Sequence, residues 1–142
     1  CDGILLSQSP LDGGVTAGDE MASYDDNNIF AKILRGEIPC NKCDEDDLTL
    51  SFYDIAPQAP VHVLVIPKGR YVDYANFVAH ASVEEIAGFS AAIHRVAEKT
   101  GISETGYRII SNIGNDGHQD VPHLHMHVLG GGAMGPMLAK RP

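Results

Sequence analysis

Three histidines alternate with apolar residues in the segment Pro122-His-Leu-His-Met-His-Val-Leu-Gly130 of this 142-residue chain. Successive side chains of a β-strand point to opposite faces. His123, His125 and His127 are therefore expected on one face, and the apolar residues between them in a core. A row of imidazoles is costly to bury unless each ring has a polar partner. The segment thus predicts a strand with one face devoted to polar chemistry.

Such a row of histidines fits two kinds of chemistry. A His-x-His pair on a strand can bind zinc with other ligands. At about 3.3 Å per residue the first and third histidines would lie about 13 Å apart, so one ion could not contact all three. Alternatively, a hydrogen bond that keeps the proton on one ring nitrogen leaves the other free as a nucleophile. The flanking imidazoles could then donate hydrogen bonds to phosphate oxygens and to a leaving group.

The charge of the chain bears on its partners. Its 10 Lys and Arg residues against 19 Asp and Glu residues give a net charge of −9, and no cluster of basic residues stands out. A protein that binds a nucleic acid polymer needs such a cluster to displace counterions. We therefore expect no nucleic acid polymer as a partner, whereas a small phosphate ligand remains compatible. No apolar run of about 18 residues predicts a membrane span.

The three cysteines, Cys1, Cys40 and Cys43, are too few for a disulfide framework in a domain of this size. This favours a reducing, cytoplasmic setting. Cys40 and Cys43 have the spacing of a zinc-binding pair, but a zinc site needs a second pair of ligands. We interpret them as ordinary reduced thiols and expect no metal.

The chain is expected to form one domain preceded by an extension. Residues 1–24 are rich in Gly, Asp and Ser and lack a hydrophobic period, so we predict a flexible N-terminal extension there and a single domain over residues 25–142. One helix is predicted over 29–34, with Asp26 or Asn27 as its N-cap, and another is opened by the capping box Ser82–Glu85.

The remaining pattern favours a sheet of short strands. Strands are predicted at 48–53, 61–66, 107–112 and 123–129, and the acidic stretch 44–47 is predicted to be a turn. Helices outside a run of strands joined by short loops indicate an α+β fold with a mainly antiparallel sheet.

The segment His123–Leu129 matches, at every position, the signature His-φ-His-φ-His-φ-φ (φ apolar) of the histidine-triad (HIT) proteins, so the chain resembles that family. The stretches Ile29–Pro39 and Tyr53–His62 also resemble its Hint branch, the purine nucleoside phosphoramidases. The similarity runs from about Asn28 to Gly132. It implies an α+β fold with an antiparallel sheet of about five strands and two main helices. It also implies a two-fold dimer that continues the sheet, and turnover without a metal or cofactor.

The resemblance assigns roles residue by residue. His125 would be the nucleophile, His123 would hold its ring through a backbone carbonyl, His127 would contact the phosphate, and His62 would support them from the neighbouring strand. The nucleotide contacts that the resemblance implies are Asp54 for the ribose hydroxyls, Ile33 and Ile55 for the base, and Asn112 and Gln119 for the phosphate region.

The implied activity is hydrolysis of nucleoside 5′-phosphoramidates, or related AMP conjugates, at the α-phosphorus. A third histidine, His127, favours a hydrolase because related nucleotidyl transferases carry glutamine there. A dinucleoside polyphosphate hydrolase and a non-catalytic nucleotide-binding module are the alternatives. Asp120 departs from the branch, which has Ser or Thr near the leaving group, so the leaving-group preference stays open. The tail 133–142 also lacks the tryptophan-containing ending of the branch.

Overall fold

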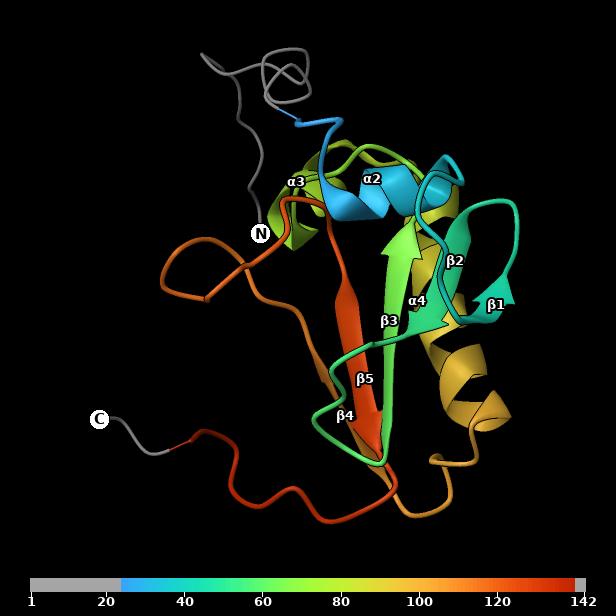
Figure 1. Ribbon diagram of the computed structural model, residues 1–142, viewed down its shortest axis with the longest axis vertical. Helices are drawn as coiled ribbons and strands as arrows, with labels where there is room; N and C mark the ends of the chain where they lie inside the picture. The colour runs from blue at the N-terminus through green and yellow to red at the C-terminus, as the bar shows by residue number, and fades with distance from the viewer. Residues whose placement is uncertain (1–23, 140–142) are drawn as a thin grey trace.

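The computed structural model describes residues 24–139, and its elements form one sheet with helices on both faces (Figure 1). Apart from Tyr24, the predicted extension lies outside the described residues. The helices are α2 (Ile29–Leu34), α3 (Tyr74–His80) and α4 (Val83–Lys99). The strands are β1 (Lys42–Glu45), β2 (Thr49–Tyr53), β3 (Val61–Pro67), β4 (Tyr107–Ile110) and β5 (Met126–Gly130). No helix within 24–139 is long and apolar enough to cross a bilayer.

The sheet has five strands in the order β1-β2-β3-β5-β4, and every neighbouring pair is antiparallel. This confirms the predicted fold class. β5 is an internal strand between β3 and β4, so the histidine-bearing end of the chain is held on both sides. In its register with β3, His127 lies opposite Leu64, and His62 opposite Leu129.

The two faces of the sheet carry different cores because strand residues alternate. Val63, Val65 and Val128 point to the face covered by α4, where they pack with Phe77 and Phe89. On the other face, the α2 residue Phe30 packs against the strand residues Leu50, Phe52, Leu64 and Ile66. The short α2 covers only part of its face (Figure 1). Its residue Phe30 also covers His123 and His125, which lie on this face.

The histidine segment departs from the prediction at its start. β5 begins at Met126, so only His127 of the three lies within the strand. The backbone before it bonds elsewhere: the Leu124 N–H donates to the Tyr71 carbonyl, and the His125 carbonyl accepts from Ser111 Oγ. The alternation of faces nevertheless holds, since Leu124, Met126 and Val128 are all buried in the α4-side core.

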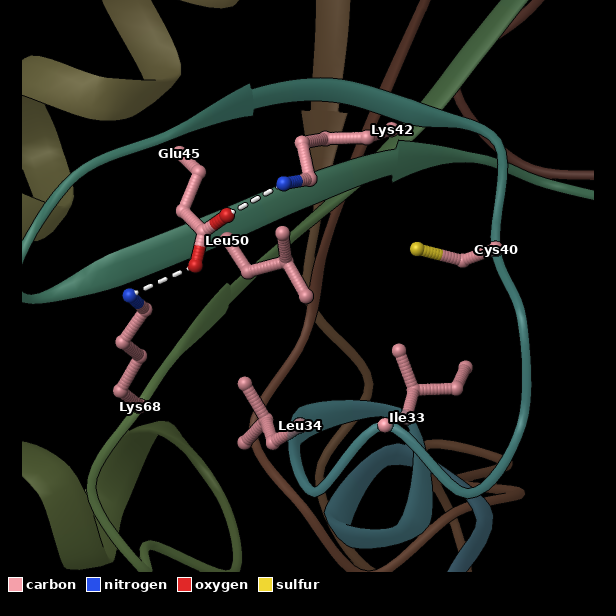
Figure 2. A pocket seen from close by; sticks show the side chains of 8 residues that line it. Ile33, Leu34, Cys40, Lys42, Glu45, Leu50 and Lys68 are labelled. Carbon is pink, nitrogen blue, oxygen red and sulfur yellow. Dashed lines mark hydrogen bonds and ion pairs between the residues drawn. The ribbon is translucent and has the colours of Figure 1, made fainter.

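The acidic stretch 44–47 was predicted to be a turn, and this is wrong for its first half, which belongs to β1. The carboxylate of Glu45 accepts from Lys42 Nζ at 2.6 Å and lies 2.8 Å from Lys68 Nζ at the end of β3 (Figure 2). The two lysines hold the pKa of Glu45 down at about 2. Charge pairing thus joins this edge strand to its sheet.

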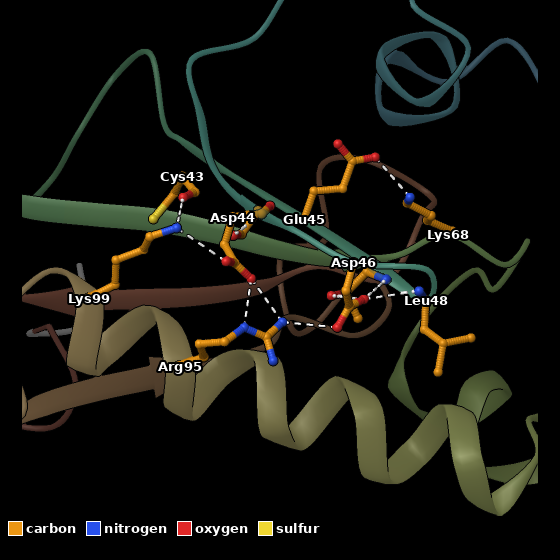
Figure 3. Close-up of polar contacts among 10 residues, drawn as sticks. Cys43, Asp44, Glu45, Asp46, Leu48, Lys68, Arg95 and Lys99 are labelled. Atoms are coloured by element: carbon orange, nitrogen blue, oxygen red, sulfur yellow. Dashed lines mark hydrogen bonds and ion pairs between the residues drawn. The ribbon is translucent and has the colours of Figure 1, made fainter.

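A second set of ion pairs joins β1 to the long helix α4 (Figure 3). Arg95 donates to Asp44 at 2.8 Å and to Asp46 at 3.0 Å, and Lys99 donates to the Cys43 carbonyl at 2.8 Å. Each exposed pair contributes little to stability. Together they fix an acidic segment that would otherwise be a solvated turn.

The helix boundaries confirm one predicted cap and correct another. Ser82 and Glu85 form the predicted capping box at the start of α4. The N-cap of α2 is Asn28, not Asp26 or Asn27: its side-chain oxygen accepts from the Ala31 N–H at 2.9 Å. Helix α3, capped by Asp73, was not predicted.

Candidate active site

His125 is held in one protonation form by its surroundings. Its Nδ1 lies 2.8 Å from the His123 carbonyl oxygen. Because a carbonyl only accepts, Nδ1 must carry the proton, and Nε2 keeps its lone pair. The ring is 5% exposed, and its edge contacts Phe30 with centroids 5.0 Å apart. Burial lowers the pKa of His125, so the ring is neutral at pH 7. Its free nitrogen can act as a nucleophile.

His123 has a structural position with both ring nitrogens occupied. Nε2–H donates to the Pro67 carbonyl at 2.9 Å, and Nδ1 therefore accepts from the Tyr24 hydroxyl at 2.5 Å. The ring is fully buried, and burial lowers the pKa of His123 to about 4. His123 thus fixes the backbone carbonyl that orients His125.

His62 and His127 form a pair whose protons are also fixed. The Gln58 N–H donates to His62 Nδ1 at 3.0 Å, so the proton of neutral His62 lies on Nε2. That N–H donates to His127 Nδ1 at 2.9 Å, which leaves the proton of His127 on Nε2. Burial, with the neighbouring His125 and His62, lowers the pKa of His127 to about 4. His127 therefore offers a hydrogen-bond donor beside the lone pair of His125, with ring centroids 5.2 Å apart.

His125 and His127 line a cavity of about 270 Å³ between α2, the end of β2 and the segment before β5. The predicted base contacts Ile33 and Ile55 both line it, as does Asp54. Ile55 is 97% exposed, so the cavity is open to solvent at that end. Its other lining residues include Ile29, Phe30, Ile38, Pro39, Cys40, Phe52, Tyr53, Leu64, Asp120 and Val121.

Asp54 combines a local role with a place in the site. Its Oδ1 accepts from the Ala56 N–H at 2.8 Å, which is an Asx-turn, and its Oδ2 lies 3.5 Å from His62 Nε2. One oxygen thus shapes the turn after β2 while the other borders the histidine pair.

Asn112 and Gln119 lie outside the lining of the cavity, and the structure shows them holding loop backbone. Gln119 Nε2 donates to the carbonyls of Val72 and Val121 at 2.7 and 3.0 Å, and its Oε1 accepts from the Gly114 N–H at 3.0 Å. Asn112 Nδ2 donates to the Gly117 carbonyl at 2.7 Å. Their contact with phosphate stays a prediction. What the geometry shows is that Gln119 ties down the segment leading into His123.

One group of residues within 24–139 has metal-ligand geometry: Asp54, His62 and His127, with ligand atoms within 4.8 Å of one another. A metal on His62 Nε2 would require the proton of a neutral ring to move to Nδ1. Nδ1 already accepts from the Gln58 N–H. The hydrogen bonds therefore fit a neutral proton-sharing pair and oppose a metal ligand. Cys40 and Cys43 are free thiols that take no part in this group.

A second hollow of about 340 Å³ shares Ile33 and Cys40 with the first cavity, and Figure 2 shows its lining. Its two cationic groups, Lys42 and Lys68, are both engaged by Glu45. It contains none of the histidines, so we place the site in the first cavity.

Sequence reasoning missed Tyr24, which falls at the last position of the predicted extension. Tyr24 is 6% exposed, and its ring lies edge-on to His123 and under the guanidinium of Arg70. No local pattern signals this, because its partner His123 is 99 residues away.

Replacing Tyr24 with phenylalanine is expected to lower the free energy of unfolding by about 1–3 kcal/mol, because the buried His123 Nδ1 loses its only donor. Urea unfolding measures this loss, and ¹⁵N spectra of the imidazoles report whether the Nε2–H form of His123 persists. The matched control is Tyr74→Phe, since Tyr74 is 42% exposed. Equal stability of the Tyr24 and Tyr74 variants would show that the hydroxyl does not support His123.

The chain is similar to proteins that contain the HIT domain. The sequence profile of the HIT domain matches residues 35–134. An uncharacterized 13.2 kDa HIT-like protein of Azospirillum brasilense is 57% identical over 118 residues, covering 83% of this chain and 97% of the relative. A purine nucleoside phosphoramidase of Escherichia coli is 42% identical over 116 residues, covering 82% of this chain and 97% of that enzyme. A solved HIT family hydrolase of Legionella pneumophila superposes with a TM-score of 0.72 at 40% identity, covering 77% of this chain and 96% of that chain.

Proposed function

This chain belongs to the HIT family, and from that membership we propose that it hydrolyses nucleoside 5′-phosphoramidates, or related AMP conjugates, through a covalent nucleotidyl-histidine. The observation that carries the proposal is the state of His125: neutral, with Nδ1–H bound to a carbonyl and Nε2 left free at a cavity. The name of the E. coli relative, a purine nucleoside phosphoramidase, supports the substrate class.

In the proposed first step, His125 Nε2 attacks the α-phosphorus on the side opposite the leaving amine. The P–N bond to the His125 ring forms while the P–N bond to the amine breaks. The ring keeps its Nδ1 proton and becomes positively charged. The His123 carbonyl, which accepts the hydrogen bond from Nδ1–H, stabilises this charge. The leaving nitrogen takes its proton from solvent at the open mouth of the cavity. In the second step water attacks phosphorus, loses a proton to solvent, and releases AMP and neutral His125.

His127 acts in this scheme as a hydrogen-bond donor and not as the acid. Its Nε2–H is placed to donate to a phosphate oxygen, and the pair with His62 has no free site for a further proton while the Gln58 contact holds. Asp54 is proposed to bind the ribose hydroxyls, and Ile33 and Ile55 the purine, because all three line the same cavity.

The test is the mass of the intact protein after rapid quenching with adenosine 5′-phosphoramidate. A gain of one adenylyl group that decays as AMP appears is the expected result. AMP that binds without an adduct or turnover would indicate a nucleotide-binding module instead. A requirement for a second nucleotide in the substrate would favour a dinucleoside polyphosphate hydrolase.

We also propose that two copies of the chain pair through β4. This strand is one of the two edges of the sheet (Figure 1), and it exposes Tyr107, Ile109 and Ile110 at 38%, 50% and 37%. An unpaired edge with apolar side chains is a site for strand addition. Sedimentation equilibrium should give twice the chain mass of 15.2 kDa. A concentration-independent monomer, or a dimer that survives Ile109→Lys unchanged, would exclude this edge.

A further inference from the structure

The charged side chains that line the cavity are all acidic. They are Asp54 and Asp120, and no Lys or Arg from the described part of the chain contributes to its wall. A site that binds a phosphate would be stabilised by positive charge, so the acidic lining of this cavity needs an explanation. Asp54 is already engaged by the Asx-turn and the histidine pair. Within residues 24–139, Asp120 has one ion-pair partner, the exposed His118.

We propose that Asp120 forms a leaving-group subsite that selects phosphoramidates whose amine part carries a positive charge. The inference rests on the proposed function and narrows its substrate class. It goes beyond that function because it assigns a preference for the charge of the leaving group.

The cavity wall combines apolar side chains suited to a base, among them Ile29, Ile33 and Phe52, with the polar groups of the reaction. His125, His127 and Asp120 line this same cavity. Asp120 is close enough to both histidines for its negative charge to favour their protonated forms. In-line attack requires the leaving group to depart on the side of phosphorus away from His125 Nε2. We place the departing amine beside Asp120, because this exposed carboxylate lines the cavity together with both histidines.

Asp120 is free to receive a cation. Its side chain is 76% exposed, and its nearest ion-pair partner is His118 Nε2 at 3.6 Å, on a ring that is itself 89% exposed. His118 has φ of +60°, the left-handed region. An ammonium group on the substrate can displace this long, solvated contact. Because the Asp120 side chain is largely exposed, water screens it from the phosphate more than from an ammonium group that touches it.

The carboxylate also suits the bond-breaking step. The leaving nitrogen gains a proton as its bond to phosphorus breaks, and the His62–His127 pair cannot supply that proton. The positive charge that develops on the nitrogen is stabilised by a nearby carboxylate. A permanent positive charge elsewhere on the amine part of the substrate is attracted by the same Asp120 carboxylate before the bond breaks.

The experiment compares three adenosine 5′-phosphoramidates of similar size, with 3-aminopropyl, propyl and 2-carboxyethyl groups on nitrogen. The wild type should hydrolyse the cationic compound with kcat/KM about tenfold above the anionic one. Asp120→Asn should reduce this ratio to about twofold, and Asp120→Glu should restore most of it. Raising NaCl should compress the wild-type ratio, because an exposed pair is screened.

Asp116→Asn is the matched control, since Asp116 is an exposed carboxylate of the same loop that does not line the cavity. It should leave the ratio at the wild-type value. Turnover of all three compounds with the same ratio in Asp120→Asn as in wild type overturns the subsite and leaves the proposed function standing. Failure of every compound to give AMP or an adduct overturns both.

Discussion

Replacing His125 with glycine is expected to lower kcat/KM for adenosine 5′-phosphoramidate by about 10⁴-fold and to abolish the adenylyl adduct. The reason is specific to one atom. The free Nε2 of His125 is the nucleophile, whereas the Nε2 of His123 donates to a carbonyl and that of His127 carries a proton. No neighbouring ring can replace it. Quenched-flow mass spectrometry and AMP release measure both effects.

The glycine variant also separates chemistry from folding. The ring it removes is 5% exposed, so its loss leaves a hollow beside Phe30 that free imidazole can enter. Added imidazole should restore part of the turnover, whereas a collapsed site would not respond. His94→Ala is the control, because the side chain of His94 is 71% exposed on α4. Retention of a tenth or more of wild-type activity by His125→Gly would place the nucleophile elsewhere.

The fold was predictable where a local pattern determines it. The alternation of histidine and apolar residues gave the correct faces, and the Ser82–Glu85 pair gave the start of α4. The errors came from distant contacts. β1 looked like a solvated turn because the partners of Asp44 in this strand are Arg95 and Lys99, about 50 residues away in sequence. Helix α3 was also missed, although Asp73 caps it.

The residues of the site could be predicted, but the position of the proton on each histidine ring could not. The resemblance to the HIT family named the histidines, Asp54 and the two isoleucines, and these residues line one cavity or border it. The protonation of each ring depends on backbone groups that no motif names: the Gln58 N–H and the carbonyls of Pro67 and His123. These bonds decide which nitrogen attacks.

The same buried, neutral histidines predict an acid-sensitive fold. Burial lowers the pKa of both His123 and His127 to about 4 in the folded protein, from the ordinary histidine value of about 6.5. Between these pH values the unfolded chain binds nearly one more proton per histidine than the folded chain. Stability therefore is fully present above pH 6.5 and falls as the pH drops toward 4. Each proton difference corresponds to about 1.4 kcal/mol per pH unit, so the buried His123 alone costs about 3 kcal/mol across this window.

Urea unfolding at pH 7.5, 6.5, 5.5 and 4.5 measures the slope, which should reach about 2 kcal/mol per pH unit near pH 5. His127→Gln should lower that slope by about 1 kcal/mol per pH unit, since one titrating ring is gone, whereas His94→Gln should leave it unchanged. The carboxylate of Glu45, with a folded pKa of about 2, adds to the slope only near pH 4.5, where the unfolded carboxyl begins to bind protons, so the His127→Gln comparison isolates the contribution of the histidine. A free energy of unfolding that is flat from pH 6.5 to 4.5 would mean that the rings protonate within the fold. The fixed tautomers of His123, His62 and His127 could not then survive, because each ring has a hydrogen-bond donor aimed at its unprotonated nitrogen.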